Sequence, residues 1–195
     1  MNTLPVLLHV GCGRSTKMHI KGFSDWHEIR LDADKEVNPD IIDSIVGVNS
    51  VSTESVDAVF SSHSIEHVYP HEVSTTLQGF HRVLKEDGFL LVTCPDLHRV
   101  CEIVVNQGLH AIAYESPMGP IAPIDIIYGH RDSIQTNPFM AHKCGFTAPS
   151  LAESLYSAGF PKVYGGQCGL DLWFMAFKTD QPQERVVELA KQFMP

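Results

Sequence analysis

A pair of glycines follows a short apolar run near the start of the chain. Residues 4–10 predict a buried strand, and Gly11-Cys12-Gly13 comes directly after it. Glycine lets the backbone turn sharply and approach a ligand closely, so a branched residue at Gly13 is expected to clash with both turn and ligand. In open α/β sheets, ligands sit beyond the carboxyl ends of the strands. The pattern predicts a ligand-binding turn, and an ordinary turn between strand and helix is the alternative.

Acidic residues stand where the next two predicted strands end. Asp32 lies 19 residues after Gly13, at the end of a strand predicted over residues 27–31. A carboxylate there can accept hydrogen bonds from both hydroxyls of a ribose, and Asp34 is a substitute for this role. Asp43 follows a short strand candidate at residues 40–43 and is placed to contact an adenine amino group, or to act only as a turn residue.

The remaining pattern alternates apolar runs with helical stretches, which indicates βαβ units and a mainly parallel sheet. Further strands are predicted over residues 56–61, 88–94, 160–167 and 170–178, and the last two should form an antiparallel hairpin. Helices are predicted over residues 71–84, between Asp96 and Gly108, between Thr147 and Gly159, and over residues 186–193. A turn at 86–88 separates the first helix from its strand. The stretch between Ser15 and His27 is too short and broken for a full helix.

Residues 110–145 do not fit this alternation. The segment contains Pro117, Pro120, Pro123 and Pro138 among aromatic and histidine residues, and its apolar content favours an ordered lid. We expect an insertion at about 108–146 that folds over the ligand and forms an acceptor pocket. Its Tyr128, His130 and His142 are the candidates for orienting an acceptor or taking its proton. The alternatives are a segment that merely caps the sheet and a contact between two copies in a homodimer.

Bulk properties narrow the class of protein. The 195 residues, 44% hydrophobic and 19% charged, predict a single globular domain. The formal net charge of -9 argues against a nucleic acid partner and against an anionic membrane surface. No apolar run is long enough to span a bilayer. Five scattered cysteines without a CxxC pair indicate reduced thiols, so we expect a cytoplasmic protein.

Two further groups of residues invite a chemical interpretation. His63, His67 and His71 are spaced by four and Glu66 adds an oxygen, yet Pro70 interrupts the helix that would align them, so we expect no metal site. Cys94 and Cys101 both sit in apolar patterns, which favours a place in the core over a nucleophilic role.

Four segments carry a resemblance to a known family. They are LLHVGCGRS at 7–15, LDADKEVNPDIIDSI at 31–45, SVDAVFSSHSIEHV at 55–68 and GFHRVLKEDGFLLVTCPDL at 79–97. In order and spacing they resemble the class I S-adenosylmethionine-dependent methyltransferases, and within them the small methyltransferase-domain group. The resemblance implies a Rossmann-like methyltransferase fold, with a mostly parallel seven-stranded sheet, a C-terminal antiparallel hairpin and helices on both faces.

The resemblance also implies roles for particular residues. Gly11, Cys12 and Gly13 would hold the methionine and ribose side of S-adenosylmethionine, Asp32 its ribose hydroxyls and Asp43 its adenine, while Ser62 and His63 would line the methionine end. Two positions depart from the family pattern. His9 stands where an acidic residue is usual, and Ser15 stands where a third glycine is often found. Loss of the acid alters the usual contact to the amino group of the cofactor.

The predicted function is methyl transfer to a small-molecule or glycan-type acceptor. Methyl transfer requires alignment and exclusion of water, and it needs a base only when the acceptor is protonated. Catalytic residues are therefore not readable from the sequence. One alternative is a methyltransferase-like cofactor-binding or interaction protein without catalysis, suggested by His9 and Ser15. Another is a nicotinamide-dependent oxidoreductase, which is disfavoured because the motif GxGxxG requires glycine where Thr16 stands.

Overall fold

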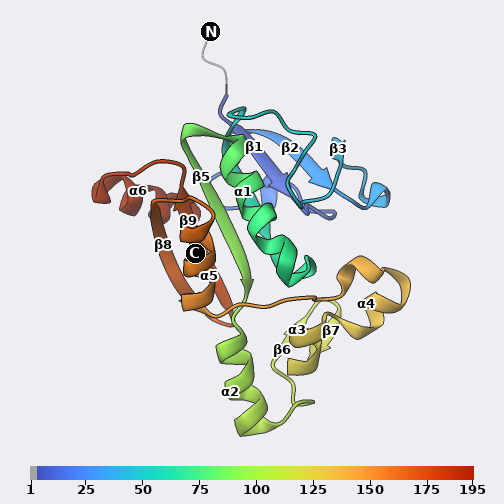
Figure 1. Ribbon diagram of the computed structural model, residues 1–195. Coiled ribbons are helices and arrows are strands. Elements are labelled where there is room, and N and C mark those ends of the chain that lie inside the picture. The colour runs from blue at the N-terminus through green and yellow to red at the C-terminus, as the bar shows by residue number, and fades with distance from the viewer. Residues whose placement is uncertain (1–3) are drawn as a thin grey trace.

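The computed structural model describes residues 4–195 and is organised around a seven-stranded sheet (Figure 1). The five strands of the first half, β1 to β5, pair in parallel in the order β3-β2-β1-β4-β5. β9 and then β8 extend the sheet beyond β5 in antiparallel pairing, so the predicted hairpin is confirmed. The strands are β1 (Val6–Val10), β2 (His27–Asp32), β3 (Ile41–Ile42), β4 (Val56–Ser62), β5 (Leu84–Pro95), β8 (Lys162–Cys168) and β9 (Asp171–Phe177).

The predicted turn at 86–88 is wrong, because these residues lie within β5. The pairing of β5 with β4 shifts from Val56 opposite Leu84 to Ala58 opposite Phe89, so an irregular bulge takes up the extra residues. Gly88 sits in this bulge, where an added Cβ would lie 3.0 Å from the carbonyl oxygen of Asp57. The residues that suggested a turn instead bend a strand that starts directly after the helix.

Two helices cover one face of the sheet. α1 (Val73–Val83) and α5 (Ala148–Ser157) each present an apolar stripe to the strands. Leu77 and Phe80 of α1 and Leu151 and Leu155 of α5 are fully buried there. The spacing of these residues is that of one helical face. Short 3-10 turns, η3 (Ile65–His67) and η4 (Pro70–Glu72), lead from β4 into α1.

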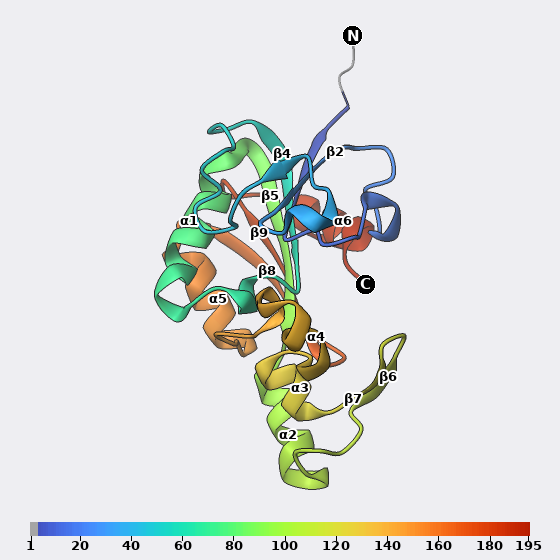
Figure 2. The same ribbon diagram turned by 90° about the vertical axis from the view of Figure 1, so that its right-hand side faces the viewer.

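The opposite face is covered by the last helix of the chain. No α-helix lies between β1 and β2, as predicted, and that connection holds only the 3-10 turn η1 (Lys17–His19). α6 (Gln183–Phe193) packs on this face, where Phe193 meets Phe23 with ring centroids 4.5 Å apart. Figure 2 shows the sheet with α1 and α5 on one side and α6 on the other. Helices therefore cover both faces of the sheet.

The segment after β5 extends beyond the carboxyl ends of the parallel strands (Figure 1). Asp96 caps α2 (Leu97–Gln107) as predicted, and Gly108 ends it, but only Val100 of α2 is fully buried. Cys101 is exposed, so its predicted place in the core is wrong, whereas Cys94 is buried.

Residues 110–145 are more regular than predicted. They form β6 (Tyr114–Ser116), β7 (Gly119–Ile121), α3 (Pro123–Tyr128), α4 (Arg131–Thr136) and the 3-10 turn η5 (Pro138–Met140). Throughout residues 4–195, every helix is too short or too polar to traverse a lipid bilayer.

Candidate active site

The two glycines after β1 have the same backbone conformation but different surroundings. Gly11 and Gly13 have φ angles of +57° and +53°, a region that favours glycine. A Cβ on Gly11 would lie 2.5 Å from the Cβ of Ser64, in the loop after β4. A Cβ on Gly13 would meet nothing within 4 Å, so the expected clash with the turn is wrong for Gly13. Gly11 permits close packing within the protein, and Gly13 leaves open space beside the turn.

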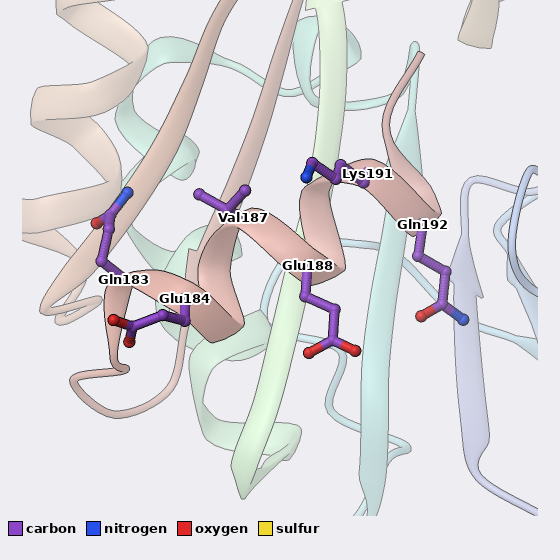
Figure 3. A pocket seen from close by; sticks show the side chains of 6 residues that line it. All are labelled: Gln183, Glu184, Val187, Glu188, Lys191 and Gln192. Atoms are coloured by element: carbon purple, nitrogen blue, oxygen red, sulfur yellow. The ribbon is translucent and has the colours of Figure 1, made fainter.

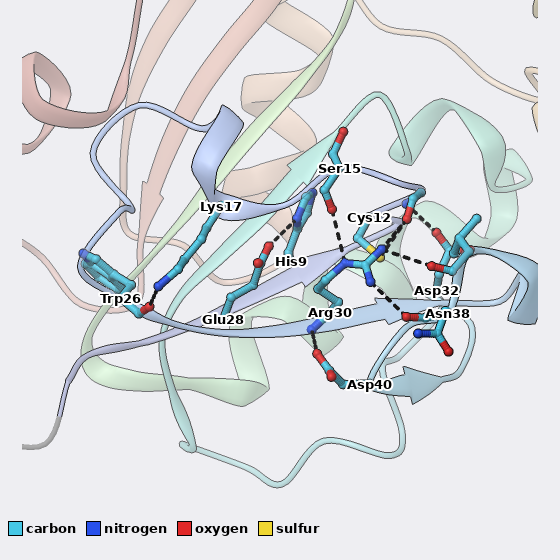
Figure 4. Close-up of polar contacts among 12 residues, drawn as sticks. His9, Cys12, Ser15, Lys17, Trp26, Glu28, Arg30, Asp32, Asn38 and Asp40 are labelled. Carbon is cyan, nitrogen blue, oxygen red and sulfur yellow. Dashed lines mark hydrogen bonds and ion pairs between the residues drawn. The ribbon is translucent and has the colours of Figure 1, made fainter.

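Asp32 holds the glycine turn in place. Its Oδ2 accepts the backbone N–H of Gly13 at 2.8 Å, and its Oδ1 accepts the N–H of Asp34 at 2.9 Å (Figure 4). A carboxylate offers about four lone-pair positions, so each oxygen can take one more hydrogen bond. The structure thus couples Asp32 to the turn, as the spacing predicted, and leaves it acceptor capacity.

Arg30 was not identified from the sequence. Its guanidinium donates to the carbonyl oxygens of Gly13 at 2.6 Å and of Asn38 at 2.9 Å, with further bonds to Ser15 and Val37. Arg30 thus ties the glycine turn to the loop after β2 (Figure 4). The available signal was the alternation of Glu28, Arg30 and Asp32 along β2, which places three polar side chains on one face of a strand.

Asp34 and Asp43 occupy the loops after β2 and β3. Asp34 caps the 3-10 turn η2 (Lys35–Val37), and its Oδ2 accepts from Nδ2 of Asn137 at 3.3 Å. Asp43 accepts the N–H groups of Ser44 and Ser50 at 2.7 and 2.9 Å. Burial opposes ionisation of Asp43, but these hydrogen bonds outweigh it and lower the pKa of the carboxyl. Asp43 is therefore an anion that shapes its own loop.

A cavity of about 320 Å³ opens beside the glycine turn. Its lining includes His9, Gly11, Cys12 and Ser62 from the sheet edge, together with Trp173 of β9 and Phe193 of α6. A larger hollow of about 680 Å³ is lined by residues of α6 alone, whose side chains point in several directions (Figure 3). That hollow is a surface feature of one helix, whereas the smaller cavity brings several elements together at the carboxyl end of the strands.

His9 lies buried in the wall of the smaller cavity. Its Nδ1 is 3.0 Å from Oε1 of Glu28 on the neighbouring strand, so Nδ1 carries the proton and donates it to the carboxylate. Burial lowers the pKa of His9, with the Glu28 contact opposing this shift. The neutral ring then keeps a lone pair on Nε2. The acid that is usual in the family is absent at position 9 of this chain, and a carboxylate lies instead one strand away, at Glu28.

Cys12 is held as a thiol. Its side chain is buried, and burial raises the pKa of the thiol to about 11. Because the thiolate is the nucleophilic form, Cys12 contributes shape and apolar surface near the turn.

Ser62 and His63, both predicted to line the methionine end of the cofactor, lie in different surroundings. Ser62 lines the cavity, and His63 has a φ of +46° and does not. The half-exposed ring of His63 lies between two carboxylates, with Nδ1 3.4 Å from Glu66 and Nε2 3.6 Å from Asp171. Desolvation disfavours its charge, but Asp171 and Glu66 together raise the pKa of His63 to about 10. His63 is therefore a cation beside the site.

The three candidates in the insertion also occupy different environments. Tyr128 is 62% exposed, and His130 Nδ1 contacts only the hydroxyl of Ser133 at 2.8 Å. His142 lies against His67 in the loop after β4, with ring centroids 4.7 Å apart. Of the three, His142 has a side-chain contact with the loop after β4, and its backbone N–H donates to the carbonyl oxygen of Tyr128 at 3.0 Å.

The arrangement of these residues and strands defines a class of fold. A glycine turn after β1, a carboxylate after β2 and a sheet order of 3-2-1-4-5 with an antiparallel extension form a nucleotide-type site at the carboxyl edge of an α/β sheet.

Comparisons with known proteins agree with this class. Residues 8–92 match the family model described as a methyltransferase domain. A methyltransferase structure from Archaeoglobus fulgidus, described as S-adenosylmethionine-dependent, superposes with a TM-score of 0.60 at 14% identity, over 89% of this chain and 86% of that one. The 1,6-didemethyltoxoflavin-N1-methyltransferase of Burkholderia thailandensis, solved with its substrate and S-adenosylhomocysteine, gives 0.52 at 18% identity, over 91% and 72%. A search of curated proteins found no match.

The fold is that of the class I S-adenosylmethionine-dependent methyltransferases, and residues 8–92 match a methyltransferase domain, as the resemblance in the sequence predicted. The matched methyltransferase domain and the neighbour with bound S-adenosylhomocysteine support methyl transfer as the activity and S-adenosylmethionine as the cofactor. At identities below 20%, the superposed structures establish the fold alone. The roles of individual residues stay predictions.

Proposed function

We propose that this chain transfers the methyl group of S-adenosylmethionine to a small-molecule or glycan-type acceptor held under residues 108–146. The observation that carries the proposal is the glycine turn, which Asp32 and Arg30 fix beside a cavity of about 320 Å³. This volume lies near the lower end of the range for pockets that bind small molecules.

The residues present fit the cofactor. The open space beside Gly13 allows a ligand to approach the backbone, and Asp32 keeps lone pairs for two ribose hydroxyls. Asp43, anionic after β3, is the partner for the adenine amino group. Gly11, Cys12 and Ser62 line the cavity for the methionine end. His63 lies outside that lining and would act on the methionine end only through its positive charge.

His9 is proposed to replace the usual acid. A carboxylate attracts the ammonium group of the cofactor by charge and accepts its hydrogen bonds. In this chain the free Nε2 of a neutral His9 accepts such a bond, and Glu28 behind the ring supplies the negative charge. The departure from the family pattern is then a substitution of one acceptor for another.

Contacts of the insertion support its role as a lid over the acceptor. Asn137 reaches Asp34 after β2, and the N–H of Lys143 donates to the carbonyl oxygen of Glu66 after β4 at 2.8 Å. The segment therefore bridges two loops at the edge where the cofactor is proposed to bind. The Burkholderia neighbour acts on a small heterocycle, and a net charge of -9 gives no attraction for nucleic acid.

The bound cofactor supplies a methyl group already activated by a positively charged sulfur. The work of the chain is to hold the acceptor in line and to exclude water. Of the sequence candidates, His142 packs against His67 in the loop after β4, whereas Tyr128 is exposed and His130 bonds to Ser133. We therefore rank His142 first for contact with the acceptor side of the site.

S-adenosylhomocysteine is expected to raise the melting temperature of the chain, because a ligand that binds only the folded state stabilises it by mass action. At a ligand concentration about 100 times the Kd, the gain is about 2.7 kcal/mol. Differential scanning fluorimetry with millimolar S-adenosylhomocysteine measures the shift, and NAD is the control ligand. A shift with NAD alone, or with neither ligand, contradicts the proposed site.

His9→Ala is expected to weaken S-adenosylhomocysteine binding by about 5- to 30-fold, which corresponds to the loss of one hydrogen bond worth about 1–2 kcal/mol. Calorimetric titration measures the Kd. The control is His27→Ala, which removes an exposed histidine at the start of β2. Equal affinities of the two variants would exclude His9 from the cofactor site.

A further inference from the structure

The carboxylate of Glu66 is buried without hydrogen bonds. Glu66 is 1% exposed, and neither oxygen has a hydrogen-bond partner among residues 4–195. The nearest cationic group, Nδ1 of His63, approaches Oε1 at 3.4 Å but outside hydrogen-bond geometry. The ion pair with His63 offsets part of the cost of burying this carboxylate, but both oxygens still have lone pairs without a hydrogen bond. Glu66 therefore has free acceptor positions for a ligand.

Two histidines beside Glu66 have their ring nitrogens arranged alike. Nδ1 of His67 is 3.1 Å from the carbonyl oxygen of Ala141, and Nδ1 of His142 is 2.7 Å from that of Ile126. A carbonyl can only accept, so in both rings Nδ1 carries the proton and Nε2 keeps its lone pair. A ring that donates one N–H to a backbone carbonyl is the usual state of a histidine that binds metal through its other nitrogen.

These three side chains converge from distant parts of the chain. One ligand atom from each of Glu66, His67 and His142 lies within 4.8 Å of the other two. Ligands of a tetrahedral ion lie about 3.4 Å apart for bond lengths near 2.1 Å, so ligand atoms up to 4.8 Å apart have to move closer when an ion binds. We propose that Glu66, His67 and His142 bind a divalent transition-metal ion, with Zn²⁺ the preferred ion.

The donor set decides the class of ion. Two imidazoles and one carboxylate suit Zn²⁺ and similar metals, whereas Mg²⁺ and Ca²⁺ select oxygen ligands. Three protein ligands leave a coordination position open, as in zinc sites that bind a water or a substrate. The spacing of His63, His67 and His71 in the sequence indicates a different set of ligands. In the structure His71 stacks on Tyr69, and the third ligand comes from the insertion.

The ion would join the insertion to the sheet. Glu66 and His67 lie in η3 directly after β4, and His142 lies near the end of the insertion. The ammonium of Lys143 already donates to the carbonyl oxygen of His67 at 2.9 Å, so the insertion contacts the loop after β4 without the metal. The metal site depends on these contacts alone and not on the proposed acceptor.

The test is a calorimetric titration of the full chain with ZnCl₂, after purification without a polyhistidine tag and treatment with EDTA. We expect one ion per chain for the wild type. Glu66→Gln and His142→Ala are expected to lose affinity by more than the roughly 10- to 100-fold typical of outer partners. His71→Ala, in the same loop, is the matched control and should bind as the wild type does. Circular dichroism shows whether each variant is folded.

A second measurement reports on the insertion. Zn²⁺ should slow cleavage of residues 108–146 by protease in the wild type and have no such effect in His142→Ala. The proposal is overturned if the wild type takes up no Zn²⁺ at micromolar concentration, or if folded His142→Ala binds it equally well. Binding of S-adenosylhomocysteine is measured on the same samples, so failure of the metal site is separate from failure of the cofactor site.

Discussion

Gly11→Ala is expected to lower the free energy of unfolding by about 2–5 kcal/mol. Its Cβ would lie 2.5 Å from the Cβ of Ser64, a contact that requires the loop after β4 to move. Overpacking of this kind costs about 1–3 kcal/mol. The φ of +57° adds about 1–2 kcal/mol for a residue with a side chain. Urea denaturation measures the change, as a lower midpoint with an unchanged slope.

Gly13→Ala is the matched control for this effect. It has nearly the same φ but open space around its Cβ, so only the conformational cost of about 1–2 kcal/mol applies. For ligand binding, we expect Gly13→Ala to have the larger effect of the two variants. A methyl group in the space beside Gly13 is expected to weaken S-adenosylhomocysteine binding at least about tenfold, or about 1.4 kcal/mol. Equal stabilities of the two variants would contradict the packing argument.

Asp32→Ala is expected to raise the Kd for S-adenosylhomocysteine by about 5- to 150-fold. The variant removes the charged acceptor proposed for the ribose hydroxyls, and hydrogen bonds to a charged group are worth about 1–3 kcal/mol. It also frees the N–H of Gly13, so the turn loses one of its two anchors while Arg30 remains. Calorimetric titration of the folded variant measures the change.

Asp40→Ala provides the comparison for Asp32. Asp40 accepts the N–H of Arg30 at 2.8 Å, so it makes the same type of bond, to the backbone of the strand that carries Asp32, without touching the glycine turn. Its removal should leave the Kd unchanged. If Asp32→Ala also binds as the wild type does, the role passes to Asp34 or is absent.

The sequence was sufficient for most of the fold because strands such as β1 (VLLHV) and β4 (VDAVFSS) are short, largely apolar runs with glycine or polar residues directly after them. The hairpin of β8 and β9 followed from the two residues between them, and Gly169 with a φ of +65° lies in that turn. The turn at 86–88 failed because Glu86-Asp87-Gly88 can equally form a bulge in a strand, and only pairing with β4 decides between the two. Residues 110–145 were harder, since their elements are too short for periodicity to show.

The candidate site could be predicted where it follows from the spacing of residues in the sequence. It could not be predicted where it depends on packing between distant segments. Gly13 and Asp32 were found from spacing alone, because the order of parallel strands brings their ends together. Arg30 and Glu28 act across strands, so their partners depend on the register of β1 and β2. The approach of His142 to Glu66 joins residues 76 positions apart, and no local pattern reports it.

Placement of α6 has a consequence for how the protein is made. Leu7 of β1 belongs to the same buried cluster as Val186 and Phe193, so the first strand is covered by the last helix. A ribosome adds about 5–20 residues per second, so roughly ten seconds or more separate the two during synthesis. Over that interval the aromatic face containing Phe23 has no helix to cover it. The nascent chain therefore exposes apolar surface, of the kind that chaperones shield, until α6 emerges.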